Sequence, residues 1–205
     1  MGRFIVFEGG EASGKSTQSA RLAARLGALH TREPGGTAIG AALRDLLLDA
    51  RTTGLDARAE ALLMAADRAQ HVAEVVRPAL ASGRHVVSDR YVGSTLAYQG
   101  YGRGLPVLAL RRISGWATGD LWPDLVVLLD VPREVAVERR PRAPDRMEAA
   151  GAAFHESVAQ GYRALAAAYD RWVVVDGAGP ADEVADRVWE TVVGRLPDLA
   201  PDWAP

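Results

Sequence analysis

A glycine-rich segment near the N-terminus, residues 9–17, limits the possible folds of this chain more than any other feature. Gly9, Gly14, Lys15 and Ser16 stand at the spacing G-x-x-x-x-G-K-[ST]. The apolar run before it, residues 3–8, predicts a strand, and the amphipathic run 15–26 predicts a helix. Glycines let the backbone curl so that its N–H groups face inward, and the helix adds its positive end to the same place. The segment therefore predicts a phosphate-binding loop between a strand and a helix.

The residue types in this loop indicate a nucleotide with a metal ion. Lys15, the only lysine in the chain, supplies an ammonium for the outer phosphates, and Ser16 supplies a hydroxyl for Mg²⁺. A glycine-rich turn that happens to contain Lys-Ser is the alternative, and the strand and helix around the loop argue against it. The residues expected to bind the nucleotide are Gly9, Gly10, Glu11, Ala12, Ser13, Gly14, Lys15, Ser16 and Thr17.

Composition excludes several classes of protein. The formal net charge of −2 argues against nucleic acid as the main partner, because such proteins favour a basic surface. The chain contains no cysteine, so neither a disulfide nor a thiolate metal site can form. No apolar run reaches the ~18 residues of a membrane span, and the predicted first strand leaves no room for a secretory signal. We therefore expect a cytoplasmic protein that does not cross a membrane.

Predicted strands and helices alternate along the chain. The clearest strand is the continuous apolar run 125–130, which is typical of a parallel strand buried on both faces. The alternation predicts an α/β fold, a five-stranded parallel sheet with helices on both faces, in a single domain over residues 1–196. We expect a loose tail at 197–205. The predicted strands are 3–8, 28–32, 84–89, 125–130 and 172–176. The main helices are 15–26, 56–81, 105–118, 132–140, 148–169 and 181–196, with apolar residues at helical spacing over 39–47 and a loop with one helical turn at 90–104.

Ligands of parallel α/β sheets bind at the carboxyl ends of the strands, so the residues directly after the strands are the candidates for the site. Asp89 ends one predicted strand and can support Mg²⁺ directly or through a bound water. Arg90 follows it and can hold a phosphate with its forked guanidinium. The alternative is a structural Asp–Arg pair at a sheet edge, which the phosphate-binding loop in the same chain makes less favoured.

Six segments together resemble the thymidylate kinase family, a branch of the P-loop nucleoside monophosphate kinases. They are FEGGEASGKST (7–17), TREPGGT (31–37), LLMAADRAQH (62–71), DRYVGSTLAYQGYGR (89–103), ATGDLWPDLVVLLDVP (117–132) and APDRME (143–148). The resemblance covers nearly the whole chain up to the tail. It implies a P-loop kinase architecture with a short lid at about 139–147, transfer of the ATP γ-phosphoryl group to dTMP with Mg²⁺ to give dTDP for dTTP synthesis, and a homodimer.

The resemblance also implies roles for individual residues. Glu11 matches the acidic residue that contacts the deoxyribose 3′-hydroxyl, and Arg68 matches the arginine that bonds the exocyclic oxygen of thymine. Arg90 matches the arginine on the dTMP phosphate, and Tyr98 is placed to crowd a ribose 2′-hydroxyl. Thr95 and Gln99 stand where the family lines the base and sugar pocket. The residues expected to act in catalysis are Lys15, Asp89, Arg90, Arg140 and Arg142, with Arg139 also in the lid.

This sequence departs from the family pattern in three places. Met64 stands where the family often has a phenylalanine that stacks on thymine. The short lid contains Pro141 and Pro144 and lacks the usual Arg-Gly before its Asp-Arg pair. No basic residue lies between Gly10 and Gly14, so we expect the extra arginine to come from the lid.

Two other functions remain open at this stage. One is a different P-loop kinase of nucleosides or nucleotides, including one with relaxed base choice. The other is a nucleotide-binding regulator without catalysis. A GTPase is excluded, because its guanine-reading Asn-Lys-x-Asp motif needs a second lysine.

Overall fold

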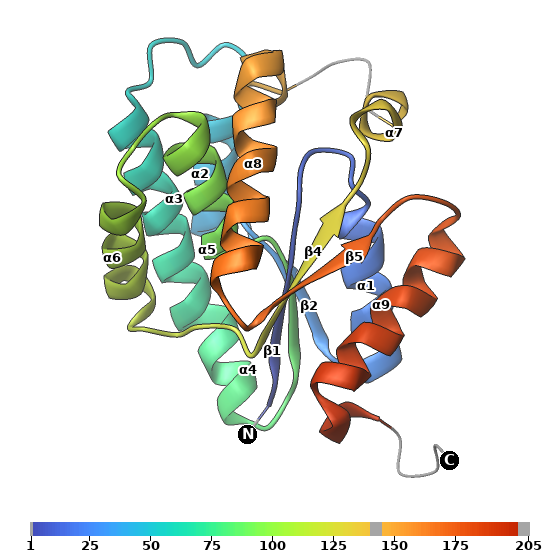
Figure 1. Cartoon of the computed structure of the whole chain (residues 1–205). Coiled ribbons are helices and arrows are strands. Elements are labelled where there is room, and N and C mark those ends of the chain that lie inside the picture. The colour runs from blue at the N-terminus through green and yellow to red at the C-terminus, as the bar shows by residue number, and fades with distance from the viewer. Residues whose placement is uncertain (1, 140–144, 201–205) are drawn as a thin grey trace.

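The computed structural model describes residues 2–139 and 145–200, and its centre is a five-stranded sheet (Figure 1). The strands are β1 (Phe4–Glu8), β2 (Leu29–Arg32), β3 (Val86–Asp89), β4 (Leu125–Asp130) and β5 (Trp172–Asp176). Their order in the sheet is β2-β3-β1-β4-β5, and every neighbouring pair is parallel. The predicted α/β class and parallel sheet are therefore confirmed.

Both faces of the sheet are buried, which explains the continuous apolar run in β4. Val126 and Leu128 pack into one core cluster, whereas Val127 and Leu129 pack into another on the opposite face. Successive side chains of a strand point to opposite faces, so a strand between two helical layers needs apolar residues at every position.

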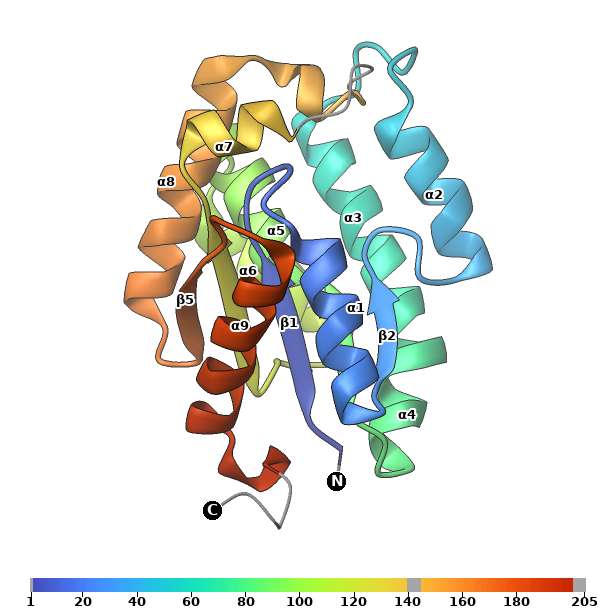
Figure 2. The same ribbon diagram turned by 90° about the vertical axis from the view of Figure 1, so that its right-hand side faces the viewer.

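The helices form a layer on each face of the sheet. Figure 2 shows α1 (Lys15–Leu26) and α9 (Ala181–Arg195) together on one face. The helices on the other face are α2 (Ala38–Leu48), α3 (Ala57–His71), α4 (Arg77–Ala81), α5 (Val92–Thr95), α6 (Val107–Thr118) and α8 (Ala152–Ala168). The short helix α7 (Arg133–Glu138) follows β4. Within the described parts of the chain, we find no helix both long and apolar enough to span a lipid bilayer.

Three segments differ from the sequence-based expectation. Residues 90–104 are mostly helical rather than a loop with one turn, because α5 continues into a π-helical segment, Leu96–Gly102. Buried apolar residues such as Leu96 and Tyr98 hold this segment against the core despite its glycines. The predicted helix 148–169 is divided at Gly151, whose positive φ of 90° separates a short 3₁₀ turn from α8. A π-helical turn, Val72–Val76, joins α3 to α4 immediately before Pro78.

The beginning of the segment that we expect to be a loose tail packs against the domain. Pro197–Leu199 forms a 3₁₀ turn, and Leu199 is buried in the core cluster under α1 and α9. Residues 201–205 lie outside the described part of the chain, as do residues 140–144 of the expected lid.

Candidate active site

The phosphate loop lies between β1 and α1, as the motif predicts. Gly14 precedes α1 with a left-handed backbone at φ 93°, and Gly9 has φ 146°. A side chain on Gly9 would collide with the Leu129 carbonyl oxygen, at 2.6 Å from the Cβ position. The buried Lys15 ammonium lies across the loop and donates to the Gly10 carbonyl at 2.6 Å. Burial and the charge of Arg90 lower the pKa of Lys15 to about 8.

Ser16 and Asp89 meet beside this loop, because β1 and β3 are neighbours in the sheet. The Ser16 hydroxyl donates to Asp89 Oδ2 at 2.5 Å. The other carboxylate oxygen, Oδ1, is buried and has no hydrogen-bond partner among the described residues. A hydroxyl beside a buried, unsatisfied carboxylate oxygen fits Mg²⁺, which prefers oxygen ligands and keeps few protein ligands when it binds nucleotides. No cluster of three or more His, Cys, Asp or Glu side chains suited to a metal occurs in the described ranges.

Arg90 and Glu11 form an ion pair at the mouth of a second pocket. Arg90 Nη2 lies 2.6 Å from Glu11 Oε1, and the Tyr98 hydroxyl donates to the same oxygen at 2.5 Å. Burial alone would raise the pKa of Glu11, but the charges of Arg90 and Lys15 outweigh it and lower this pKa to about 2. Glu11 is therefore ionised at neutral pH and presents an acceptor to the pocket. Arg90 has the left-handed φ of 73°, an unusual value for a non-glycine residue.

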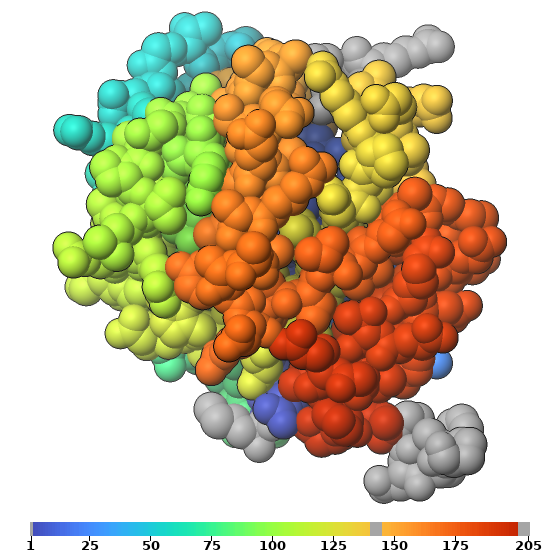
Figure 3. Space-filling view, in the orientation of Figure 1, coloured from blue at the N-terminus to red at the C-terminus, as the bar shows by residue number. Residues whose placement is uncertain are grey.

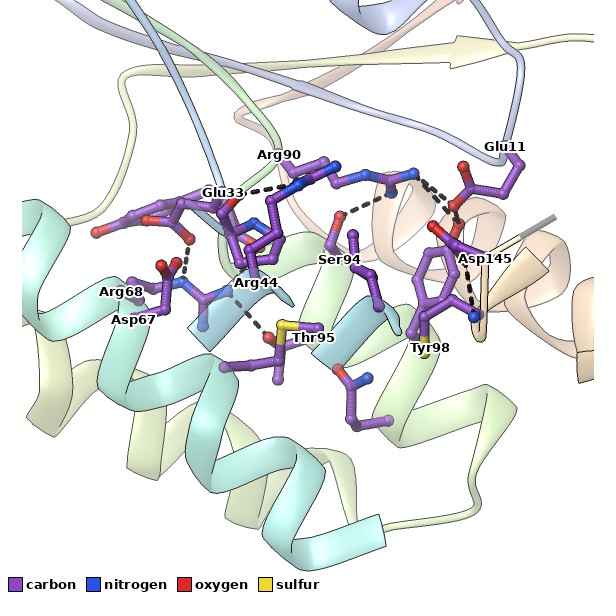
Figure 4. Close-up of a pocket in the computed structure, with 16 residues that line it drawn as sticks. Glu11, Glu33, Arg44, Asp67, Arg68, Arg90, Ser94, Thr95, Tyr98 and Asp145 are labelled. Carbon is purple, nitrogen blue, oxygen red and sulfur yellow. Dashed lines mark hydrogen bonds and ion pairs between the residues drawn. The ribbon is translucent and has the colours of Figure 1, made fainter. Parts of the chain in front are cut away.

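The second pocket lies between α2, α3 and α5, and Figure 4 shows its polar side chains. The predicted residues Glu11, Met64, Arg68, Arg90, Thr95, Tyr98 and Gln99 all line it, together with Glu33, Pro34, Arg44, Leu48, Asp67, Tyr91, Ser94, Asp145 and Met147. The structure thus brings together residues from three segments of the sequence that were predicted to bind one substrate.

Arg68 is buried with one edge of its guanidinium occupied and one nitrogen free. Its Nε donates to Glu33 Oε2 at 2.7 Å, and its Nη2 donates to the Thr95 hydroxyl at 3.0 Å. Its Nη1 is buried and finds no acceptor in the described part of the chain. A buried donor without a partner costs free energy, so Nη1 is available for a ligand oxygen in the pocket.

Gln99 presents a defined face to the same pocket. Its Nε2 donates to Glu60 Oε1 at 2.8 Å, so the nitrogen end of the amide lies on the Glu60 side and uses one of its two protons there. Glu60 itself is buried and also pairs with Arg103 and Arg146. The Gln99 amide is therefore held with its oxygen as the group left to contact a bound molecule.

Sequence reasoning missed several residues that build this pocket. His71 Nδ1 hydrogen bonds Glu33 Oε1 at 2.8 Å, and its Nε2 hydrogen bonds the Thr31 hydroxyl at 2.7 Å. This buried chain fixes the Glu33 carboxylate that holds Arg68. Arg44 was also missed, although it lines both the second pocket and the phosphate-loop cavity. For Glu33, the sequence did contain a signal: it is the glutamate of the TREPGG segment and stands directly after β2.

The lid is described only at its edges. Arg139 donates to the carbonyl oxygens of Gly177 and Gly179, each at 3.1 Å, and it borders the phosphate-loop cavity. Arg140 and Arg142, the predicted catalytic arginines, lie outside the described residues. Figure 3 shows the phosphate loop in blue at the bottom of a hollow between α7 and α8, which agrees with a cavity lined by Gly10 and Glu11.

The two cavities define a class of protein. One contains the phosphate loop with a candidate Mg²⁺ pair, and the other is a pocket that shares Arg90 and Arg44 with it. A donor-nucleotide site that meets an acceptor site at shared cations is the arrangement of a P-loop phosphotransferase acting on a small phosphorylated acceptor.

Comparisons with known proteins identify the family within this class. The thymidylate kinase family model matches residues 7–188. Thymidylate kinase of Solidesulfovibrio magneticus is 50% identical over 208 residues, covering 94% of this chain and 99% of the relative. That of Thermomicrobium roseum is 52% identical over 201 residues, covering 94% and 95%. The crystal structure of thymidylate kinase from Ehrlichia chaffeensis superposes with a TM-score of 0.78 at 29% identity, covering 93% of this chain and 98% of that one. The chain belongs to the thymidylate kinase family.

The pocket carboxyl Asp67 gives the fold a pH dependence that can be measured. Burial and the charge of Glu33 raise its pKa to about 6, well above the ordinary range of an aspartate. The folded state therefore binds the proton of Asp67 more tightly than the unfolded state does. This stabilises the fold below pH 4, and the stabilisation is lost as the pH rises through 6. Relative to Asp67→Asn, the wild type should lose up to about 3 kcal/mol of unfolding free energy between pH 4 and pH 7.5.

Urea unfolding of both proteins across this range measures the difference. Asp182→Asn, at a carboxylate with a side-chain exposure of 88%, is the control. Parallel stability curves for the wild type and Asp67→Asn would contradict the assignment.

Proposed function

We propose that this chain transfers the γ-phosphoryl group of ATP to dTMP, giving dTDP and ADP in the synthesis of dTTP. Its membership of the thymidylate kinase family supports the reaction. The observation that carries the choice of acceptor is the free Arg68 Nη1 in a pocket where Gln99 offers its amide oxygen.

These two groups match the hydrogen-bonding edge of thymine. Arg68 Nη1 donates to an exocyclic carbonyl oxygen, and the Gln99 oxygen accepts from the ring N3–H. Cytosine has an amine and an unprotonated ring nitrogen at the same places. Its amine would face the Arg68 donor, and its ring nitrogen would face the Gln99 oxygen, so neither hydrogen bond could form. Each such mismatch in a buried site costs about 1–3 kcal/mol. Met64 lies in the same wall and supplies an apolar, adaptable surface for the base.

Glu11 and Tyr98 suit the deoxyribose. The ionised Glu11 carboxylate accepts a hydrogen bond from the 3′-hydroxyl. The Tyr98 ring is fixed by its hydroxyl on Glu11 and by edge contacts with Phe154 and Tyr162, at centroid distances of 6.0 and 6.2 Å. A fixed ring beside the sugar leaves little room for a 2′-hydroxyl and so favours the deoxynucleotide.

The chemistry needs positioning and charge neutralisation more than a general base. An oxygen of the acceptor phosphate, already ionised at neutral pH with a second pKa of about 6, attacks the γ-phosphorus, and the bond to the β-phosphate oxygen breaks. Arg90 and Arg44 neutralise the acceptor phosphate so that two anions can approach. Lys15 and the loop amides hold the β- and γ-phosphates, and the lid arginines Arg140 and Arg142 add positive charge to the transferring group.

Ser16 and Asp89 would hold Mg²⁺, which would supply positive charge to the nucleotide phosphates. Closure of the lid excludes water, which limits hydrolysis of ATP.

An acceptor panel tests the reaction. ADP release from ATP and Mg²⁺ should depend on dTMP and be slower with dUMP, which lacks the methyl group. With dCMP, dGMP or thymidine, kcat/KM should fall at least about a hundredfold, because two buried mismatches or a missing phosphate oppose binding. Lys15→Ala should lose most of kcat and serves as the control for a contaminating kinase. Equal rates with dCMP would indicate another nucleotide kinase, and no acceptor-dependent release would indicate a non-catalytic regulator.

Substitution of Arg68 tests the base contact separately. Arg68→Met should raise KM for dTMP by about tenfold to a hundredfold, because a charged hydrogen bond to the base is lost, and change KM for ATP little. Steady-state kinetics with each substrate varied measures the split. Arg58→Met, at an exposed position on the same helix, is the matched control. Similar increases for both substrates would remove the base-reading role.

We also propose that the chain acts in the cytoplasm as a homodimer, with nucleotides rather than nucleic acid as partners, which the net charge of −2 supports. Helices α3 and α6 pack side by side and expose large apolar residues, with Trp116 87%, Leu108 60% and Leu62 56% exposed. An apolar surface of this kind favours burial against a second copy.

Trp116→Arg should convert the dimer to a monomer, because it places a charge in an apolar interface. Light scattering coupled to size-exclusion chromatography measures the mass of each form. Val174→Arg, at an exposed apolar residue on β5, should leave the dimer intact. A wild-type mass equal to that of one chain would contradict the proposal.

A further inference from the structure

Glu8, the last residue of β1, is a fully buried carboxylate to which the phosphate-loop motif gives no role. Its exposed fraction is 0%. Its Oε1 accepts from the backbone N–H groups of Tyr91 and Ser94, both at 3.0 Å. Its Oε2 accepts from the Ser94 hydroxyl at 2.6 Å and from the Tyr162 hydroxyl at 3.1 Å. A buried charge is expensive unless it is hydrogen-bonded, so four donors on one carboxylate indicate a built arrangement.

The Ser94 and Tyr162 hydroxyls, which contact Glu8 on one side, also contact the Arg90 guanidinium. Arg90 Nη1 lies 3.2 Å from the Ser94 oxygen and 3.3 Å from the Tyr162 oxygen. A hydroxyl has one proton to donate and lone pairs that accept. Ser94 and Tyr162 donate to Glu8, and their two oxygens also lie 3.0 Å from each other. The arginine can only donate, so each hydroxyl meets Nη1 with a lone pair.

We propose that Glu8 is a positioning residue for Arg90, acting through the Ser94 and Tyr162 hydroxyls. This inference rests on the proposed role of Arg90 as a ligand of the acceptor phosphate. Glu8 makes both hydroxyls acceptors, and these hold the Nη1 edge of the arginine in place. The Nη2 edge is then presented toward the pocket, where Glu11 now occupies it and the acceptor phosphate binds.

The two carboxylates act differently on the two edges of Arg90. Glu11 belongs to the phosphate loop and pairs with Nη2 directly at 2.6 Å. Glu8 belongs to a central strand of the sheet and reaches Nη1 only through hydroxyls. Nη1 also donates to the Gly9 carbonyl oxygen at 3.3 Å, and Nη2 donates to the Tyr98 hydroxyl at 3.4 Å. The Nη1 edge is therefore held by three groups, two of them bonded to Glu8, whereas the carboxylate on Nη2 belongs to the loop.

Gly93 leaves the space that this arrangement needs. A Cβ at this position would lie 2.7 Å from Glu8 Oε1 and 2.7 Å from the Trp172 ring. The carboxylate therefore lies directly against the start of α5, where it accepts from the N–H groups of Tyr91 and Ser94.

Comparison of dTMP with thymidine separates positioning of Arg90 from support of the fold. Calorimetry measures the affinity of each for the wild type and for Glu8→Gln, which keeps the shape and an oxygen for the backbone N–H groups. The Gln amide donates to the hydroxyls instead of accepting, so their lone pairs no longer converge on Arg90. The affinity for dTMP should fall by about tenfold or more, as for loss of a charged hydrogen bond, and the affinity for thymidine should change less than about twofold.

Two further variants make the result decisive. Arg90→Met should abolish the wild-type preference for dTMP over thymidine; if the wild type has no such preference, the proposed role of Arg90 fails. If that preference exists and Glu8→Gln weakens both ligands equally or neither, the inference about Glu8 is overturned. Tyr162→Phe removes one acceptor of Arg90, and with it a contact to the Ser94 hydroxyl, but it leaves the backbone N–H bonds from Tyr91 and Ser94 to Glu8 in place, so it should also weaken dTMP alone. If Glu8→Gln does not fold, the dTMP affinity of Tyr162→Phe tests the inference instead. Unchanged dTMP binding in Tyr162→Phe would then overturn it.

Discussion

The parallel register of β1 with its two neighbours is the constraint on which the site depends. It places Phe7 opposite both Asp89 of β3 and Val127 of β4, so the chain leaves all three strands at one edge of the sheet. The phosphate loop, the Asp89–Arg90 pair and the segment after β4 therefore meet without any long connection. The two apolar cores lock this register, because a slip of one residue would turn every core side chain to the wrong face.

Both substrate-facing arginines are held by buried hydrogen-bond networks rather than by a single ion pair. Arg68 is fixed by Glu33, which the His71–Thr31 pair fixes in turn. Arg90 is held by Glu11 and by two hydroxyls. In each case one part of the guanidinium is saturated by protein groups, so the remaining part has a defined direction. Preorganisation of this kind removes the entropic cost of fixing a long side chain when the substrate binds.

The sequence was sufficient for the family, the fold class and the phosphate loop, all of which are confirmed. Period and apolar runs located β4, β5 and α1 at their observed bounds, since each buries a regular face. They failed at residues 90–104, where tertiary packing of Tyr91 and Leu96 overrides the effect of glycine on a helix. Buried polar partners such as Glu8 and Ser94 are 86 residues apart, and no local pattern reports such a pair. The individual catalytic roles remain predictions.

Lys15 is the only lysine in a chain whose other long cations are arginines. Its ammonium lies in the curve of the loop and donates to the Gly10 carbonyl oxygen. The chain therefore has a single side-chain amine, and that amine lies in the loop that we propose to hold the donor phosphates. Acylation of lysine, which elsewhere spreads over many surface positions, has only this one side chain to modify here. It would remove the positive charge that the nucleotide requires.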